Sequence, residues 1–316
     1  MYIRELNILK NDKITYRKIL KQGLQTNAAM NHKNVTAVLL LSCPDRKGLV
    51  AGVSTFLYHN NGNIIHADQH TDMEKGIFLQ RVEWELKDFK IPRDKIGEAF
   101  KPLANKFNMK WHLRFSDNTS RMAIFVSKEE HCMYELLLRQ RMKEFNVEIP
   151  LIISNHPDLQ PIAENFGVEF HYYPITPKTK ASYEQRMLKN LEEHDIDLIV
   201  LAKYMQVLSN KIISKYQNKI INIHHSFLPA FAGGKAYHQA HQRGVKIIGA
   251  TAHYVTAELD QGPIIEQDVM RVSHRDSVED LTRKGKDMEK IVLARAVDLH
   301  LQNKVLVYDN KTVVFD

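Results

Sequence analysis

Two short segments in the second half of the chain carry side chains that together can attack a carbonyl carbon. One is Ile-Asn-Ile-His-His-Ser-Phe-Leu-Pro at 221–229, and the other is Leu-Asp-Gln-Gly-Pro at 259–263. Asn222 and His224 are two residues apart, so their side chains point to the same face of a strand. An amide can hold an oxyanion, an imidazole can move a proton, and a carboxylate, here Asp260, can activate water. The sequence therefore predicts a site for attack on a carbonyl, with a loop that brings the carboxylate to the other two groups.

Each of these residues taken alone also has a simpler explanation. Polar groups at a strand end often only cap a loop, and an aspartate before Gly-Pro is common in turns. Glu258 is a second carboxylate close to Asp260 and a rival for the same role. The combination of an amide, two imidazoles and a hydroxyl within 222–226 is what favours a functional site.

The chain offers little support for metal, serine or thiol chemistry. His224 and His225 are adjacent, so they diverge on a strand, and the sequence contains neither His-Glu-x-x-His nor paired Cys-x-x-Cys motifs; we expect no metal. Ser226 lacks the Gly-x-Ser-x-Gly turn that surrounds a nucleophilic serine. Cys132 follows His131, and neighbours on a helix do not face each other, so we expect a half-buried structural thiol there.

The composition is that of a globular protein. The chain has 316 residues, 44% hydrophobic and 26% charged, which suggests two domains. Its apolar runs fall short of the roughly 18 residues that span a bilayer, so we expect no membrane partner. Two cysteines form no disulfide framework, which makes a reducing cytoplasm the expected compartment. Residues 1–30 contribute +4 of the net charge of +7, so no concentrated basic surface for nucleic acid is expected.

The first part of the chain is expected to be a compact α+β domain at 34–115. Apolar periodicity and turn residues give the ferredoxin-like order βαββαβ. Residues 1–33 are expected to be an N-terminal extension, for which a disordered tail, a helical tail and an upstream start codon all stay open, as does a mitochondrial targeting peptide, against which Glu5 and Asp12 argue. Strands are expected at 35–43, 63–72, 76–86 and 109–115, and helices at 49–59 and 93–107.

After a polar linker at 116–121, the expected catalytic domain covers 122–316. Short apolar strands alternate there with helices, which indicates a mostly parallel sheet covered on both faces. Such sheets bind ligands beyond the carboxyl ends of their strands, which is where Asn222 and His224 lie. Strands are expected at 122–126, 150–154, 170–173, 198–202, 219–224, 247–254 and 262–272, helices at 129–144, 160–166, 180–194, 208–215 and 277–302, and a closing hairpin at 305–307 and 312–315.

The loop after the first strand of this domain argues against a bound nucleotide. It reads Val-Ser-Lys-Glu-Glu-His at 126–131 and contains no glycine. Phosphate is usually cradled by a glycine-rich loop at a helix N-terminus, and Glu129 and Glu130 would repel it. We therefore expect neither a nucleotide nor a phosphorylated acceptor at this turn.

The separated motifs together resemble the folate-dependent formyltransferase family, and most closely its deformylase branch. The resemblance covers about 34–316, and its strongest part is 222–229, 251–256 and 258–263. Pro-Asp-x-x-Gly-Leu-Val at 44–50 resembles the turn and helix start of an ACT domain, although Lys47 replaces a usual proline. Further matching motifs are 68–72, 81–84, 154–156, 204–205, 237–240 and 310–315. The resemblance implies a Rossmann-like formyltransferase domain preceded by an ACT domain.

The resemblance also implies a reaction and its residues. The reaction is hydrolysis of 10-formyltetrahydrofolate to formate and tetrahydrofolate without a metal or other cofactor, which supplies formate and balances the one-carbon folate pool for purine synthesis. Asn222 would hydrogen-bond the formyl oxygen, His224 would stabilise the same charge or shuttle a proton, and Asp260 would orient and deprotonate water. The implied folate pocket consists of Met205, Val207, Leu208, Val255, Thr256 and Glu258.

Departures from the related transformylases bear on the choice between water and an amine. His225 stands where the glycinamide ribonucleotide enzyme has proline, and the phosphate-binding glycine loop is missing; both fit hydrolysis. An amine-dependent transformylase, which would need a second pocket, stays open as an alternative. So do a methionyl-tRNA formylating enzyme, which would need a further C-terminal domain, and a folate-responsive regulator without catalysis. The ACT resemblance implies a small amino-acid effector and, because such modules often pair edge to edge, a homo-oligomer.

Overall fold

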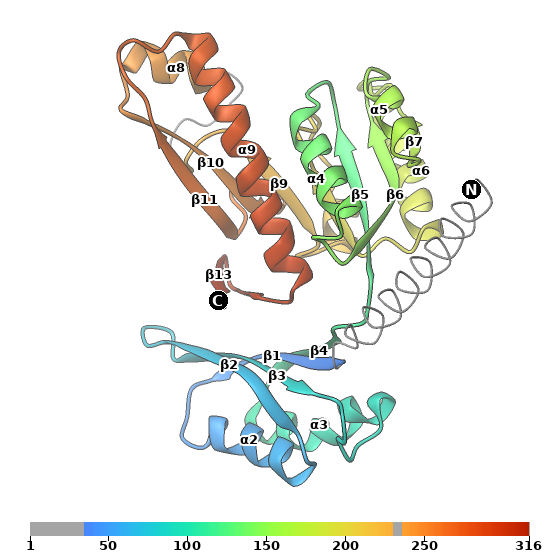
Figure 1. Cartoon of the computed structure of the whole chain (residues 1–316), viewed down its shortest axis with the longest axis vertical. Coiled ribbons are helices and arrows are strands. Elements are labelled where there is room, and N and C mark those ends of the chain that lie inside the picture. The colour runs from blue at the N-terminus through green and yellow to red at the C-terminus, as the bar shows by residue number, and fades with distance from the viewer. Residues whose placement is uncertain (1–34, 230–235, 316) are drawn as a thin grey trace, which may run out of the picture.

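The computed structural model of the chain describes residues 35–229 and 236–315, which form two α/β units joined by a short connection (Figure 1). The extension predicted at residues 1–33 lies outside the described residues. A four-stranded sheet belongs to the first unit and a seven-stranded sheet to the second. Within the described ranges, no helix is both long and apolar enough to cross a membrane. The predicted fold class is confirmed.

The first unit has the ferredoxin-like arrangement. Its antiparallel sheet has the order β2-β3-β1-β4, and α2 and α3 lie on one face (Figure 1). Alternate residues of β1, among them Leu39 and Leu41, pack against Leu57 and Phe100 of the two helices. The elements are β1 (Thr36–Pro44), α2 (Leu49–His59), β2 (Asn63–Asp72), β3 (Ile77–Glu85), the short 3-10 helix η1 (Arg93–Lys95), α3 (Ile96–Phe107) and β4 (Lys110–Phe115).

The second unit is built on a sheet with the order β11-β10-β9-β8-β5-β6-β7. Neighbouring strands from β7 to β9 run parallel, whereas β10 and β11 are antiparallel additions at one edge. The elements are β5 (Ser120–Val126), α4 (His131–Arg141), β6 (Val147–Ser154), α5 (Gln160–Asn165), β7 (Glu169–Tyr172), α6 (Lys180–Glu193), β8 (Leu198–Leu201), α7 (Asn210–Lys215), β9 (Ile220–His224), α8 (Ala236–Arg243), β10 (Ile247–Tyr254), β11 (Ile264–Arg271) and α9 (Val278–Leu301).

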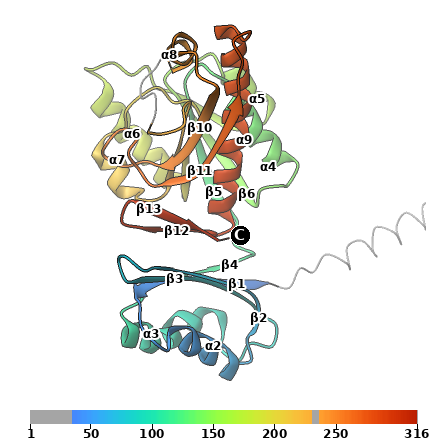
Figure 2. The same cartoon turned by 90° about the vertical axis from the view of Figure 1, so that its left-hand side faces the viewer.

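Helices cover both faces of the larger sheet, as the apolar strands predict. α4, α5 and α9 pack on one face, and α6 and α7 on the other (Figures 1 and 2). Successive residues of β5 show the division, since Ile124 belongs to the first core and Phe125 to the second. Because both faces are buried, polar chemistry is left to the edge of the sheet where the parallel strands end.

A C-terminal hairpin, β12 (Val305–Tyr308) and β13 (Lys311–Val314), lies between the two units (Figure 2). Leu306 and Phe315 are buried there against Leu40 and Leu79 of the smaller sheet. Polar contacts reinforce the junction: the Tyr308 hydroxyl donates to Asp72 (3.2 Å), Arg81 donates to the carbonyl oxygen of Asn303 (3.0 Å), and Lys75 pairs with Asp309. The face of the smaller sheet that its own helices leave uncovered is therefore occupied by the hairpin.

Several boundaries differ from those expected from sequence. β5 begins at Ser120, within the range assigned to the linker, and β11 begins at Ile264, after the Gly-Pro turn. The helix expected from 208 begins at Asn210, because Ser209 keeps an extended backbone as its N-cap. α8 was not predicted at all, since Ala-Tyr-His-Gln-Ala-His-Gln-Arg has no apolar periodicity.

Candidate active site

A pocket of about 240 Å³ opens at the carboxyl ends of β8 and β9. Its walls come largely from the segments 201–208, 222–225 and 253–260, the first two of which begin within the carboxyl-terminal ends of the parallel strands β8 and β9. Every site residue predicted from the sequence lines it: Asn222, His224, Asp260, Met205, Val207, Leu208, Val255, Thr256 and Glu258. The prediction that these distant segments converge is thus realised in the fold, whereas the roles of the residues stay a prediction.

Asn222, His224 and Asp260 meet in one cluster with a fourth residue, His253. The Nδ1 atom of His224 lies 3.3 Å from Oδ2 of Asp260, and the Nε2 atom of His253 lies 3.6 Å from Oδ1. The amide nitrogen of Asn222 lies 3.3 Å from the same Nε2 atom of His253. An amide, two imidazoles and a carboxylate therefore converge on one wall of the pocket.

The pairing of β9 with β10 explains this convergence. The two strands are antiparallel, and Asn222 lies directly opposite His253 in their register. Because β10 runs against β9, the chain that leaves β10 emerges beside the start of β9 and must turn back to reach its carboxyl end. The loop between β10 and β11 makes this return and carries Asp260 to the imidazole of His224.

The return loop is held by a close approach that only glycine permits. A Cβ atom on Gly262 would lie 1.7 Å from the carbonyl oxygen of Tyr254, so any other residue would push the loop outward. Asp260 itself has a left-handed backbone (φ 55°). From the other side, the Asn310 side chain donates to the carbonyl oxygen of Gln261 (2.8 Å). Local backbone geometry and the C-terminal hairpin together fix where the carboxylate points.

The imidazoles make Asp260 a permanent anion at neutral pH. Its hydrogen bond with His224, followed by that with His253, holds the pKa of the carboxyl far below its usual range. The Nε2 atom of His224 is buried and has no hydrogen-bond partner among the described residues. A buried polar atom without a partner is uncommon in native proteins and calls for a functional explanation.

His253 was missed by the sequence reasoning, although it lies within the quoted motif 251–256. Its Nδ1 atom lies 2.9 Å from the carbonyl oxygen of Tyr254, so Nδ1 carries a proton that it donates. The Asn222 amide nitrogen lies beside Nε2 of the same ring, and because an amide nitrogen carries two N–H groups, one of them stays available for a ligand. A histidine inside an otherwise apolar strand was the available signal, but only the strand register reveals its partner.

The expected folate-binding side of the pocket is apolar and partly exposed. Met205 and Val207 are exposed at its mouth, whereas Leu208 is buried beneath them. The loop that carries them is anchored because the backbone N–H of Met205 donates to the Ser127 hydroxyl (2.9 Å). Lys203, with a left-handed backbone (φ 64°), is a further lining residue that was not predicted. A lysine directly after the apolar strand was its signal in the sequence.

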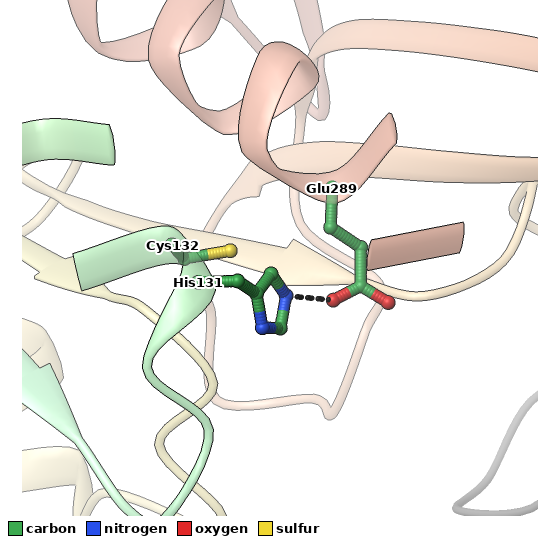
Figure 3. A group of neighbouring side chains, drawn as sticks. All are labelled: His131, Cys132 and Glu289. Atoms are coloured by element: carbon green, nitrogen blue, oxygen red, sulfur yellow. Dashed lines mark hydrogen bonds and ion pairs between the residues drawn. The ribbon is translucent and has the colours of Figure 1, made fainter. Parts of the chain in front are cut away.

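A second polar cluster lies behind the pocket, where α4 begins beside α9 (Figure 3). One ligand-type atom from each of His131, Cys132 and Glu289 falls within 4.8 Å of the others. The Nε2 atom of His131 donates to Glu289 (2.8 Å), and the ammonium group of Lys203 lies 3.2 Å from the same carboxylate oxygen. Burial raises the pKa of the Cys132 thiol well above its usual value, so it stays protonated. Lysine and histidine thus already supply the positive charge beside this carboxylate.

Two expectations about this cluster were wrong. Cys132 is fully buried rather than half-buried. Its sulfur also lies near a ring nitrogen of His131, although adjacent helical side chains were expected to diverge.

The comparisons with known proteins agree with this architecture. A family described as formyl transferase matches residues 120–297, and the ACT domain family matches 37–104. A formyltetrahydrofolate deformylase of Synechocystis is 58% identical over 283 residues, 90% of this chain and 99% of that protein. One from Bacillus subtilis is 47% identical and covers 88% of this chain and 93% of its own.

Solved structures give the same result. A formyltetrahydrofolate deformylase from Pseudomonas syringae superposes with a TM-score of 0.89 at 45% identity, covering 94% of this chain and all of that one. A glycinamide ribonucleotide transformylase from Symbiobacterium toebii superposes with a TM-score of 0.59 at 28% identity, covering 65% of this chain and 98% of that one. The chain therefore belongs to the formyltetrahydrofolate deformylase family.

Proposed function

We infer that this chain is an enzyme that hydrolyses 10-formyltetrahydrofolate to formate and tetrahydrofolate. The observation that carries the inference is the convergence of Asn222, His224 and ionised Asp260 on one wall of an otherwise largely apolar pocket. Pockets of this kind suit a flat heterocycle, with a few polar groups that fix its orientation. The family to which the chain belongs supplies the identity of the heterocycle as a formylated folate.

In the proposed mechanism Asp260 orients the attacking water. A carboxylate with so low a pKa is a weak base, so its first contributions are to accept a hydrogen bond from water and to stabilise a protonated His224. As the water attacks the formyl carbon, its proton passes to this carboxylate–imidazole pair and on to the departing folate nitrogen. Positioned proton transfer of this kind contributes about 10²–10⁴-fold to the rate.

Asn222 and His224 stabilise the negative charge that develops on the formyl oxygen. Asn222 keeps one N–H for this oxygen, because its other N–H is directed to His253. We assign the unpartnered Nε2 atom of His224 to the reacting group, since a ligand there would satisfy a buried nitrogen that otherwise has no bond. One oxyanion donor contributes about 10²–10³-fold.

The pterin ring of the substrate is assigned to the apolar side of the same pocket. Met205, Val207 and Leu208 would cover its faces, and the segment 255–258 would meet its polar edge. Val255, Thr256 and Glu258 all line the pocket, which supports this assignment. Neither the reaction nor the pocket requires a metal or a cofactor in this scheme.

A direct assay tests the reaction. Purified protein receives 10-formyltetrahydrofolate and no amine, and formate and tetrahydrofolate are measured together. Equal amounts of both products are expected. Release of the formyl group only after an amine acceptor is added would instead identify a transferase, and binding without turnover would identify a regulator.

We also propose that the ACT domain binds a small amino acid and that the chain forms a homo-oligomer. The edge strand β2 supports the second proposal, because its residues are exposed from Asn63 to His70 and an open strand edge is a ready surface for pairing. Rates measured with individual amino acids, together with calorimetry, test the effector. Sedimentation at the working concentration tests the oligomer, and a monomer would contradict it.

The proposed cellular role is to supply formate and balance the one-carbon folate pool for purine synthesis. A reducing cytoplasm suits the protein, since Cys43 and Cys132 are both free, buried thiols. Deleting the gene and measuring purine-dependent growth together with the formyl-folate pool tests this role. Unchanged pools after deletion would contradict it.

A further inference from the structure

One wall of the pocket is backed by stacked aromatic rings. His225 directly follows His224, and the two rings stack with their centroids 5.0 Å apart. The ring of Tyr237, at the start of α8, lies 5.9 Å from the ring of His225. His225 lines the pocket, whereas Tyr237 is not among the lining residues. His224, His225 and Tyr237 thus form a row of neighbouring rings that begins at the pocket wall.

Tyr237 is fixed by the buried cluster described above. Its hydroxyl donates to Oε1 of Glu289 (2.7 Å), a carboxylate that is 1% exposed. The other oxygen of Glu289 accepts from His131, as Figure 3 shows, and pairs with Lys203, which also lines the pocket. His225 and Lys203, two polar residues on the pocket wall, are thus both backed by the Tyr237–Glu289 pair.

The helix α9 contains a recess that matches Tyr237. A Cβ atom on Gly285 would lie 1.9 Å from the hydroxyl oxygen and 2.2 Å from the nearest ring carbon of Tyr237. Glycine in a helix interior costs about 1 kcal/mol relative to alanine, so a packing reason for it is expected. Here the missing side chain makes room for the phenol, so α9 supplies both the recess at Gly285 and the carboxylate of Glu289 that bonds the hydroxyl.

We propose that the rings of His225 and Tyr237 form a plug that closes the acceptor side of the formyl site, so that water but no amine reaches the formyl carbon. The proposal rests on the function proposed above. A transferase of the same fold needs room for a second substrate beside the formyl group, at the strand-end edge where such sheets bind ligands. In the described part of this chain, that position next to His224 is taken by side chains with a rigid anchor.

If His225 and Tyr237 form such a plug, a smaller side chain in place of Tyr237 should allow an amine to reach the formyl carbon. When glycinamide attacks, its nitrogen bonds to the formyl carbon and the bond from that carbon to the folate nitrogen breaks. The proton that the attacking nitrogen loses balances the proton that the folate nitrogen gains. The products are formylglycinamide and tetrahydrofolate in place of formate and tetrahydrofolate, so the ratio of formylglycinamide to formate reports the access of amines.

The experiment measures this product ratio for the full chain with 10-formyltetrahydrofolate and excess glycinamide. Tyr237→Ala is expected to raise the ratio at least tenfold over the wild type. Gly285→Ala, which displaces the phenol without removing it, is expected to change the ratio in the same direction. Tyr237→Phe keeps the ring and is expected to stay close to the wild type. Tyr134→Ala, at a partly exposed tyrosine on α4 away from the pocket, is the matched control and is expected to leave the ratio unchanged.

Two results would overturn the inference in distinguishable ways. If the wild type releases no formate, the proposed hydrolysis fails and the plug fails with it. If the wild type hydrolyses the substrate while folded Tyr237→Ala and Gly285→Ala both keep the wild-type ratio, only the plug fails. Thermal melting establishes that each variant folds, and Tyr237→Leu replaces Tyr237→Ala if the latter does not.

Discussion

The chain contains two carboxylates that sit beside imidazoles, and their surroundings differ in an instructive way. Asp260 lies in a loop with a left-handed backbone and faces the pocket between His224 and His253. Glu289 lies on a helix, is 1% exposed, and has both oxygens bonded to neighbouring side chains. Both clusters contain a buried ring nitrogen without a hydrogen-bond partner among the described residues, Nε2 of His224 and Nδ1 of His131, but of these two histidines only His224 lines the pocket. Residue type alone does not separate a reactive carboxylate from a structural one; unused bonding capacity next to a cavity does.

Among the variants that test this comparison, Asp260→Asn should have the largest effect on kcat. The amide keeps the shape of the side chain but can neither accept the proton of water nor stabilise a protonated His224, so kcat should fall by about 10³-fold or more. Binding of tetrahydrofolate, followed by fluorescence, should change little. Asp268→Asn, at an exposed carboxylate on β11 that pairs with Arg295, is the control and should keep full activity. Near-normal turnover in Asp260→Asn would remove this residue from its role.

Asn222→Ala tests whether this residue, in the same cluster as Asp260, stabilises the negative charge on the formyl oxygen. Loss of one donor to the developing charge should lower kcat by about 10²–10³-fold while the KM for the folate stays within a few-fold. Steady-state kinetics measure both constants. A rise in KM with unchanged kcat would instead place Asn222 in ground-state binding.

Glu289→Gln tests the other carboxylate, where the main effect should be on stability. Removing the charge leaves the largely buried ammonium group of Lys203 without its partner, and breaking a buried pair in this way costs about 3–5 kcal/mol. The midpoint of urea denaturation measures the loss. Glu184→Gln is a matched control, because this buried carboxylate is bonded to the backbone N–H of Ser209 and should cost about 1 kcal/mol. Equal losses in both variants would contradict the ion-pair account.

The stability difference between the wild type and Glu289→Gln should also depend on pH. Burial alone would raise the pKa of Glu289, but the hydrogen bond from His131 and the charge of Lys203 outweigh it and lower the pKa from 4.5 to about 2. A group with a lowered pKa stabilises the fold fully above its unfolded pKa and loses that contribution as pH falls through the folded value. The stability difference between wild type and Glu289→Gln should therefore be constant above about pH 4.5 and shrink towards about pH 2. A difference that grows on acidification would reverse the assignment.

Asn310→Ala should have the smallest effect on kcat of the variants considered. It tests whether the C-terminal hairpin helps to position the carboxylate of Asp260. It removes the hydrogen bond to the carbonyl oxygen of Gln261, next to Asp260. The loss of about 1 kcal/mol in holding the loop corresponds to a roughly fivefold fall in kcat. Asn63→Ala, which removes a side-chain bond to Glu85 on the exposed edge strand, should leave kcat unchanged. Equal kcat values for both variants would show that the loop of Asp260 keeps its position without the hydrogen bond from Asn310.

Sequence reasoning located the elements and most of the pocket because its signals are local. The short apolar run at 35–43 is a local signal of a buried strand, and the two-residue spacing of Asn222 and His224 places their side chains on one face of a strand. The contact of His253 with Asn222 depends on the register of two antiparallel strands, which no single segment encodes. α8 escaped notice because its polar sequence has no period, although Tyr237 within it is anchored by tertiary contacts to Glu289.

The hairpin β12–β13 contacts both the loop that carries Asp260 and the sheet of the smaller unit. At its turn, Asp309 pairs with Lys75 of the smaller unit, while the next residue, Asn310, holds the loop that aims the reactive carboxylate. Two adjacent residues of the hairpin turn thus contact the ACT sheet on one side and the catalytic loop on the other. Removing residues 305–315 would therefore expose the buried apolar face that Leu306 and Phe315 cover on the smaller sheet and would also take away the hydrogen bond from Asn310 to the catalytic loop.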